Sequence, residues 1–201
     1  MISGIPSHFH FFLASRSPRR QQLLRELGLE FEIVIREYDE NYPQGLSGAE
    51  IAEYLSSKKA SLFREDISEH EIVITSDTIV WCDNQVLDKP SGPEDAVRIL
   101  KILSGKTHEV ITGVTFLSDK GEYTFSDATK VTFDNLTDEE IAYYVNEFKP
   151  YDKAGGYGIQ EWIGLTGIIS IEGSYFNVVG LPVQKLYREL IKYINNISKQ
   201  D

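Results

Sequence analysis

Two patterns of apolar residues alternate along the chain, and each predicts a different kind of element. Short continuous apolar runs are typical of buried strands, whereas apolar residues spaced three and four apart are typical of helices facing a core. The runs predict strands at residues 9–14, 31–35, 71–76, 78–82, 85–89, 108–118, 122–133, 167–172 and 176–180. The spaced stripes predict helices at residues 18–27, 47–64, 93–105, 138–148 and 182–197.

Residues at the ends of these segments support the assignment. Ser17 can cap the first helix, and the pairs Ser47/Glu50 and Thr137/Glu140 have the spacing of capping boxes. Short turns at residues 83–84, 119–121 and 173–174 predict hairpins. Because helices alternate with strands and several strands form hairpins, we expect an α/β protein with a mixed central β-sheet flanked by helices.

Composition limits the classes of function. The chain has 201 residues, of which 41% are apolar, so we expect a single domain spanning residues 1–201. A net charge of −11 opposes binding to nucleic acid or to an anionic membrane, although a local cationic pocket could still hold a small anion. The lone cysteine, Cys82, lies in an apolar run and is expected to be a buried, inert thiol. Because no membrane span or secretory signal is recognisable, we expect a cytoplasmic protein.

The segment S-R-S-P-R-R, residues 15–20, concentrates cations at the start of a predicted helix. A helix N-terminus attracts anions, so Arg19 and Arg20 occupy positions that are unfavourable for the isolated helix. A bound phosphate would remove that cost and accept hydrogen bonds from both guanidinium groups. A solvated basic turn accounts for the same residues, and this local pattern leaves both interpretations open.

Other residues suggest chemistry more weakly. Lys59 lies on the same helical stripe as the apolar Ile51 and Leu55, so it either reaches the rim or points into a cleft. Asp77 follows an apolar run and is expected at the end of that strand, where ligands gather in α/β sheets. A turn residue bonded to its own backbone is the alternative interpretation of Asp77.

The segment Y-D-K-A-G-G-Y-G-I-Q, residues 151–160, places three glycines near two tyrosines. Glycines allow backbone to approach a flat ligand closely, but an ordinary flexible loop has a similar composition. His8 and His10 have the alternate spacing of a strand face that clamps a metal, and a position in a variable tail is the favoured alternative. His70 and His108 have no partner that the sequence reveals.

Taken in order, several segments resemble the Maf family, the septum-formation proteins that act as nucleoside triphosphate pyrophosphatases. The segments are LASRSPRRQQLL, SSKKA, SDTIV, VLDKP, ILKILSGKTHEVITGV, DKAGGYGIQ and GSYFNVVGLP. The resemblance implies two lobes around a cleft, as in inosine-triphosphate pyrophosphatases. It also implies hydrolysis of a nucleoside triphosphate to the monophosphate and pyrophosphate, with Mg²⁺ or Mn²⁺ as the divalent cation.

The resemblance also implies roles for particular residues. Glu40 and Asp77 match the acids that would hold the metal, with Asp77 as the proton acceptor and Asp39 as the neighbouring alternative to Glu40. The residues matching substrate-binding or phosphate-site positions are Ser15, Arg19, Arg20, Lys59, Thr78, Lys89 and Gln160. Arg19, Thr78 and Gln160 match the residues at the corresponding positions of the subgroup that hydrolyses dTTP and UTP. The subgroup usually has G-A-D where this chain has T-S-D ending at Asp77, and we expect little effect from that difference.

Three functions are consistent with these residues and with the resemblance. The first is a pyrophosphatase for dTTP and UTP, including modified pyrimidine triphosphates. The second is a 7-methyl-GTP-type pyrophosphatase of the same fold, and the third is a non-catalytic nucleotide-binding regulator of cell division. Glu40 and Asp77 favour an enzyme, because a simple phosphate binder gains nothing from added negative charge. The expected partner is a small nucleoside triphosphate, and a homodimer is the assembly expected from the family.

Overall fold

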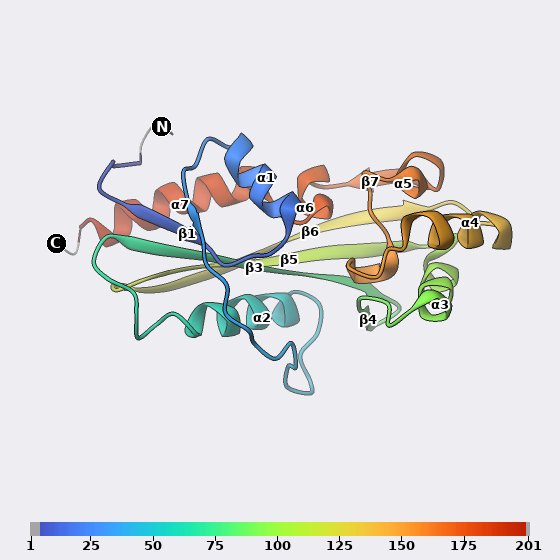
Figure 1. Cartoon of the computed structure of the whole chain (residues 1–201), viewed down its shortest axis with the longest axis horizontal. Helices are drawn as coiled ribbons and strands as arrows, with labels where there is room; N and C mark the ends of the chain where they lie inside the picture. Colours follow the sequence, from blue (N-terminus) through green and yellow to red (C-terminus); the bar gives the residue numbers. More distant parts are fainter. Residues whose placement is uncertain (1–4, 200–201) are drawn as a thin grey trace. The chain divides into compact units, whose positions relative to one another are not determined.

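The computed structural model describes residues 5–199, which form a mixed α/β fold (Figure 1). The strands are β1 (His10–Leu13), β2 (Glu32–Ile33), β3 (Glu71–Cys82), β4 (Gln85–Leu87), β5 (Thr107–Ser118), β6 (Gly121–Phe133) and β7 (Ile168–Glu172). The helices are α1 (Pro18–Glu26), α2 (Ala49–Ser61), α3 (Pro93–Leu103), α4 (Asp138–Phe148), the 3₁₀ turn η1 (Ala154–Gly156), α5 (Trp162–Thr166), α6 (Tyr175–Val179) and α7 (Val183–Ile197).

The chain divides into two compact units. Within the described residues, unit 1 contains residues 5–77, 112–127 and 180–199, and unit 2 contains residues 78–111 and 128–179. The strands β3, β5 and β6 contribute residues to both units. The two expected lobes, the cleft between them and the single domain over residues 1–201 stay predictions.

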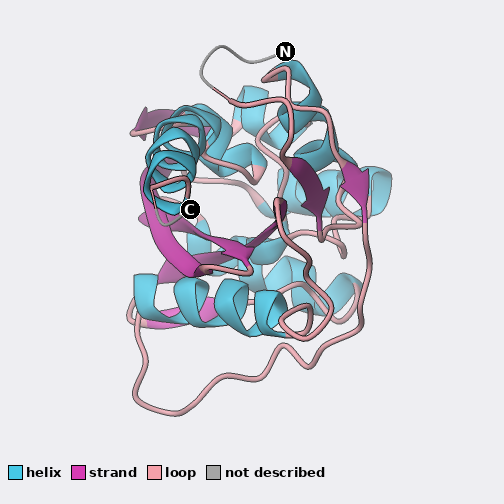
Figure 2. Cartoon of the chain, turned by 90° about the vertical axis from the view of Figure 1, so that its left-hand side faces the viewer, coloured by secondary structure: helices cyan, strands magenta, loops and turns pink. Residues whose placement is uncertain are grey.

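Unit 1 is a sheet covered by helices on both faces. Its strands follow the order β2-β1-β3-β5-β6, and β1 is parallel to both β2 and β3. Helix α2 covers one face, and α1 and α7 cover the other, so the apolar sides of these strands are enclosed (Figures 1 and 2). One of the core clusters joins Ala14, directly after β1, to Ala60 of α2, Val73 of β3 and Leu117 of β5.

Unit 2 combines short hairpins with small helices. Strand β4 is antiparallel to β3, and β7 is antiparallel to β6. Asp83 and Asn84 form the turn between β3 and β4 with positive φ angles of 50° and 59°, as a two-residue hairpin turn requires. Parallel pairs at β1 together with these antiparallel pairs confirm the predicted mixed sheet.

Three details of the predicted elements were wrong. The predicted strands 71–76 and 78–82 form one continuous strand, β3, so Asp77 lies within a strand rather than at its end. Residues 176–180, predicted as a strand, belong mainly to α6, where Ser174 accepts a hydrogen bond from the Asn177 N–H. Gly48 rather than Ser47 is the N-cap of α2, because the Ser47 hydroxyl donates to the Glu50 carboxylate instead of capping the helix.

The other predicted helix caps were confirmed, as was the burial of Cys82. Ser17 caps α1, with its hydroxyl accepting from the Arg20 N–H at 3.5 Å. Thr137 and Glu140 form the predicted capping box of α4. Cys82 is buried, and burial raises the pKa of its thiol, as expected for an inert cysteine. No helix within residues 5–199 is both long enough and apolar enough to cross a membrane.

Gly113→Ala is expected to lower the free energy of unfolding several times more than a glycine-to-alanine change at a position where the added Cβ meets open space. A Cβ at residue 113 would lie 2.1 Å from the Ala52 carbonyl oxygen, so α2 would have to move away from β5. Overpacking of this kind costs about 1–3 kcal/mol or more. The free energy of unfolding in urea measures the change. Gly92→Ala is the matched control, since a Cβ there meets no atom within 4 Å; equal stability of the two variants would contradict the expectation.

Candidate active site

The main-chain carbonyl of Ser76, in the middle of β3, joins two cations in unit 1. Arg20 Nη1 donates to this oxygen at 2.7 Å, and Lys59 Nζ donates to it at 3.1 Å. Arg20 Nε also donates to the Gly180 carbonyl at 2.9 Å, so its guanidinium is held by two separate segments. The first turn of α1 and the last turn of α2 thus bring their cations to the same point of the sheet.

Asp77 follows Ser76 in β3 and adds a negative charge beside the two cations. Its Oδ1 lies 3.7 Å from Lys59 Nζ, and the two side chains are only 14% and 12% exposed. The Asp77 charge raises the pKa of Arg20, against the larger effect of burial, which lowers it. A buried carboxylate requires such partners, which explains why an acid is tolerated in the middle of an apolar strand.

Tyr38 is a member of this cluster that sequence reasoning missed. The Lys59 ammonium lies 4.6 Å from the centroid of the Tyr38 ring, within the range of a cation–π contact. Burial, followed by the charges of Asp77 and Glu40, raises the pKa of the Tyr38 phenol, so it stays protonated at neutral pH. Tyr38 lies between β2 and α2 outside any regular element, where no periodic pattern could have indicated its neighbours.

A chain of buried hydroxyl groups holds α2 in the position that places Lys59. The Thr75 hydroxyl on β3 donates to the Ser56 carbonyl at 2.7 Å, and the Ser56 hydroxyl lies 3.0 Å from that of Thr115 on β5. Leu55 and Ile51 are buried one and two turns before Lys59, respectively, on the same stripe. The sequence left open whether Lys59 reaches the rim or points inward, and in the structure its side chain is only 12% exposed.

The two acids before α2 have different environments. The Asp39 carboxylate accepts hydrogen bonds from the Asn41 side chain at 2.7 Å and from its N–H at 3.1 Å, which lowers the Asp39 pKa. The charge of Glu40 instead adds to the burial and the Asp77 charge that raise the pKa of the Tyr38 phenol, and it offsets a small part of the burial that lowers the pKa of Arg20. These contributions favour Glu40 over Asp39, and the role of Glu40 in a site stays a prediction.

Ser15 and Arg19 flank the cluster on the α1 side. Ser15 is buried, and its hydroxyl accepts from the Ser17 N–H at 3.2 Å, which shapes the turn into α1. Arg19 is partly exposed, and its charge lowers the pKa of Arg20. Two like charges in the first turn of one helix repel each other, and this arrangement favours a bound anion.

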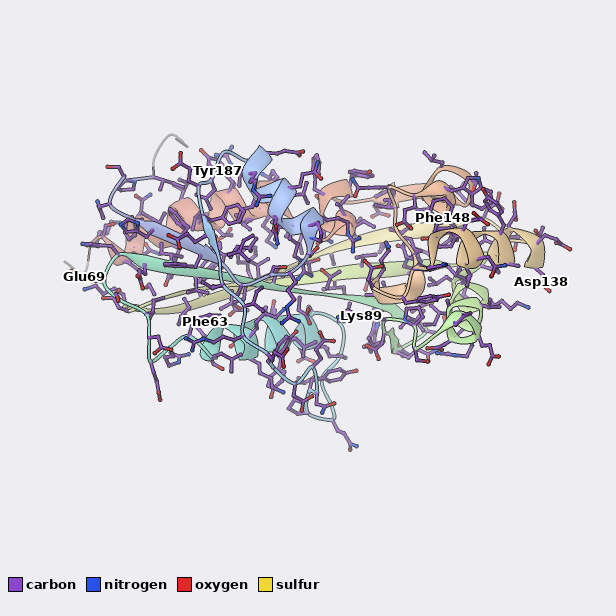
Figure 3. All side chains as sticks on the ribbon, in the orientation of Figure 1. Phe63, Glu69, Lys89, Asp138, Phe148 and Tyr187 are labelled. Atoms are coloured by element: carbon purple, nitrogen blue, oxygen red, sulfur yellow. The ribbon has the colours of Figure 1, made fainter. Side chains whose placement is uncertain are left out.

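The remaining predicted residues, Thr78, Lys89 and Gln160, belong to unit 2. Thr78 continues β3 directly after Asp77 and is partly buried. Lys89 is exposed in the segment after β4 (Figure 3). Gln160 is exposed at the end of the glycine-rich segment. Whether these side chains join Arg20, Lys59 and Asp77 at one site stays a prediction.

The glycine-rich segment that carries Gln160 is fixed within unit 2. Glu161 accepts a hydrogen bond from the Tyr144 hydroxyl and lies 3.0 Å from Lys153 Nζ. A Cβ on Gly155, where φ is +69°, would lie 2.7 Å from the Val80 side chain. The glycine at residue 155 is therefore needed for packing against β3, a role that the sequence pattern did not distinguish from contact with a ligand.

His108 acts in the structure rather than in the charged cluster. Its Nε2 lies 2.7 Å from the hydroxyl of the buried Tyr157, and its ring stacks on Phe133. Burial lowers its pKa to about 4, so it is neutral at pH 7. The sequence revealed no partner for His108, because Tyr157 and Phe133 are distant along the chain.

The carboxylates fit a divalent metal only in part. Within residues 5–199 there is no group of three or more His, Cys, Asp or Glu side chains that could hold a metal by itself. Asp77 and Glu40 both act on the Tyr38 phenol and supply hard oxygen ligands. Mg²⁺ commonly takes one or two carboxylates and completes its coordination with water and substrate phosphates. These two acids suit that kind of site, in which the substrate supplies the remaining ligands.

Together these features describe an α/β protein with a compact charged site suited to a phosphate compound. The family model for Maf-like protein matches residues 10–193, and the chain belongs to the Maf family.

Curated relatives are similar over nearly the whole chain. A dTTP/UTP pyrophosphatase of Bacteroides thetaiotaomicron is 50% identical over 185 residues, covering 92% of this chain and 96% of the relative. One from Flavobacterium johnsoniae is 49% identical, covering 90% and 94%. One from Christiangramia forsetii is 46% identical over 196 residues, covering 98% and 100%.

Solved structures are more distant. A nucleoside-triphosphatase / dITP/XTP pyrophosphatase from Mycobacterium abscessus is 15% identical with a TM-score of 0.40, covering 64% of this chain and 76% of that one. The Staphylococcus aureus Ham1 protein is 11% identical with a TM-score of 0.43, covering 62% and 71%.

Proposed function

We propose that this protein is a nucleoside triphosphate pyrophosphatase that hydrolyses dTTP and UTP to the monophosphate and pyrophosphate. The observation that carries the proposal is 50% identity, over 92% of the chain, to a relative named dTTP/UTP pyrophosphatase. The cluster of Arg20, Lys59 and Asp77 supports it, because cations that bind polyphosphate lie beside an acid that can serve the reaction.

In the proposed reaction, the residues of unit 1 hold the triphosphate and move one proton. Arg20, Arg19 and Lys59 attract the phosphate oxygens, and the two carbonyls that bind Arg20 fix the direction of its guanidinium. A water oxygen bonds to a phosphorus atom of the α,β-anhydride while the bond to the bridging oxygen breaks. The electron pair leaves with the departing phosphate group, and the proton of the water passes to Asp77.

Mg²⁺ or Mn²⁺ would be held by Asp77 and Glu40, and when bound it would neutralise phosphate charge and polarise the water. Ser15 shapes the phosphate-binding turn through its contact with the Ser17 N–H. Lys89 is proposed as a further phosphate-binding cation and Thr78 as a substrate contact. The cytoplasmic location and the homodimer remain predictions.

Release of pyrophosphate from a panel of nucleoside triphosphates, with Mg²⁺ or Mn²⁺, tests the proposed function. We expect dTTP and UTP to be the best substrates. Preference for 7-methyl-GTP would place the chain in the other subgroup. Nucleotide binding without release of pyrophosphate from any nucleotide would instead favour the non-catalytic regulator.

Gln160→Ala is expected to raise the KM for dTTP and UTP by about tenfold, the effect of losing hydrogen bonds to the base. The amide can donate to O4 and accept from N3–H of thymine or uracil. Inhibition by inorganic tripolyphosphate, which has no base, should change by less than about twofold. Gln85→Ala, an exposed glutamine on β4, is the control. An equal loss for the nucleotides and tripolyphosphate would refute base recognition by Gln160.

A further inference from the structure

Gln160 lies at the exposed corner of a tight turn in unit 2. The Gly158 carbonyl accepts a hydrogen bond from the Glu161 N–H at 3.0 Å, which closes a β-turn over residues 158–161. Ile159 and Gln160 are the two central residues of this turn. The Ile159 side chain is buried, whereas Gln160 is exposed. The turn therefore anchors one central side chain in the core of unit 2 and presents the other to solvent.

The hydroxyl of Tyr144 on α4 contacts both ends of this turn. It accepts a hydrogen bond from the Gly158 N–H at 3.0 Å and donates one to the Glu161 carboxylate. Tyr144 is fully buried, and its ring stacks on Phe148 with 5.1 Å between the centroids, so the helix fixes the position of the hydroxyl. Burial, then the bond to Glu161 and more weakly the Asp152 charge raise the pKa of the phenol, while the Gly158 N–H lowers it. The net shift is upward, so the hydroxyl keeps its proton at neutral pH and can donate to the carboxylate.

The Glu161 carboxylate is also held from the other side. Its Oε1 lies 3.0 Å from Lys153 Nζ, and the Lys153 side chain is mostly buried. The same ammonium donates to the Asp152 carboxylate at 2.7 Å. A Cβ on Gly158 would lie 2.8 Å from Glu161 Cδ, so a larger residue there would push the carboxylate off the turn. The carboxylate therefore lies against the turn, between a cation and the Tyr144 hydroxyl.

We propose that Tyr144 is a positioning residue, whose hydroxyl clamps residues 158 and 161 together and thereby holds the Gln160 amide in the direction that reads thymine or uracil. This inference rests on the proposed function, because recognition of the base by Gln160 is part of it. Tyr144 is fully buried and acts through Gln160 rather than on the nucleotide itself.

The turn needs such a clamp to hold one conformation. A single backbone hydrogen bond stabilises a turn only weakly, because water competes for both of its groups. A hydrogen bond to an ionised carboxylate is stronger, and two bonds to one buried hydroxyl fix the distance between the ends of the turn. Without the hydroxyl, Gln160 would take up several directions, and binding of a base would first have to order the turn.

A double-mutant cycle tests the inference with probes that need no turnover. The dissociation constants of α,β-imido-dTTP and of inorganic tripolyphosphate, each with Mg²⁺, are measured calorimetrically for the wild type, Tyr144→Phe, Gln160→Ala and the double variant. We expect Tyr144→Phe to weaken binding of the dTTP analogue by about three- to tenfold, and by no more than Gln160→Ala does. Beside Gln160→Ala, the same change should weaken it by less than about twofold. Binding of tripolyphosphate, which has no base, should change by less than about twofold in every variant.

Tyr143→Phe is the matched control, because Tyr143 is the neighbouring tyrosine on α4 and is exposed. Its ring contacts Trp162, and phenylalanine keeps that contact. The control should leave both dissociation constants unchanged. Glu161→Ala removes the other end of the clamp and should weaken the dTTP analogue selectively, again by about three- to tenfold. It takes the place of Tyr144→Phe in the cycle if thermal unfolding shows that Tyr144→Phe has lost its fold.

Three results would overturn the positioning role. The first is an equal effect of Tyr144→Phe with and without Gln160. The second is an equal weakening for the dTTP analogue and for tripolyphosphate, which would limit Tyr144 to supporting the fold. The third is unchanged binding of the analogue in both Tyr144→Phe and Glu161→Ala.

The outcome for the proposed function is read separately. Each of these results leaves it intact if the wild type releases pyrophosphate from dTTP. A wild type that binds the analogue without hydrolysing dTTP would contradict the function, while the cycle would still decide the role of Tyr144. A wild type that does not bind the analogue would overturn both.

Discussion

Asp77→Asn is expected to lower kcat for dTTP by about 10²- to 10⁴-fold, the usual effect of losing a general base. Asparagine has the same shape but cannot accept the proton of the attacking water and is a weaker metal ligand. Removing a negative charge 3.7 Å from Lys59 should favour binding of a polyanion. We therefore expect the dissociation constant of α,β-imido-dTTP to change by less than about fivefold.

The kinetic comparison has a natural control in Asp39→Asn. Asp39 is an exposed acid in the same unit, and its carboxylate is occupied by Asn41. Its loss should leave kcat within about twofold of the wild type. A kcat for Asp77→Asn within tenfold of the wild type would remove Asp77 from the proposed role. A large loss of kcat in Asp39→Asn would show instead that Asp39, rather than Glu40, is the second acid of the site.

The position of Asp77 shows where the sequence pattern was insufficient. A polar T-S-D-T segment interrupts two apolar runs, and the interruption suggested the end of a strand. In the structure β3 continues to Cys82, because Lys59 and Arg20 from two helices supply partners for the polar groups in its middle. Such partners come from distant parts of the chain, so local periodicity does not reveal them.

Helical spacing was more informative. The stripe of Ile51, Leu55 and Lys59 indicated a lysine on the inner face of α2, and Lys59 is indeed mostly buried. Arg20 was found from its unfavourable place at a helix start, an argument from electrostatics rather than from hydrophobicity. Tyr38 had neither signal, since it lies outside any regular element and its contact with the Lys59 ammonium forms only in the folded chain.

The family resemblance supplied what local reasoning could not. Thr78, Lys89 and Gln160 have no feature in the sequence that separates them from ordinary surface residues. Their proposed roles depend on matching segments of the family, and their exposure or partial burial in unit 2 is compatible with contact to a ligand. The Gln160 variant therefore tests the part of the proposed function that depends most on the family resemblance.

Arg20→Lys is expected to weaken both stability and substrate binding, although it keeps the positive charge. Arg20 joins the Ser76 carbonyl of β3 to the Gly180 carbonyl before α7 through two different nitrogens of one planar group. A lysine ammonium cannot reproduce this fixed two-direction geometry. Leaving one buried carbonyl without its partner costs about 1–3 kcal/mol. Urea unfolding should show that loss, and the KM for dTTP should rise by about tenfold or more because the phosphate-binding cation is no longer oriented.

Arg25→Lys separates this geometric effect from the effect of exchanging any arginine on α1. Arg25 is exposed in the last turn of the same helix and lies over the Phe31 ring, with a distance of 5.4 Å to the centroid. Its replacement should change the free energy of unfolding by less than about 0.5 kcal/mol and leave the KM unchanged. If Arg20→Lys behaved like this control, the two carbonyl contacts would not be what orients the cation. The phosphate-binding role of Arg20 would then depend on its charge alone.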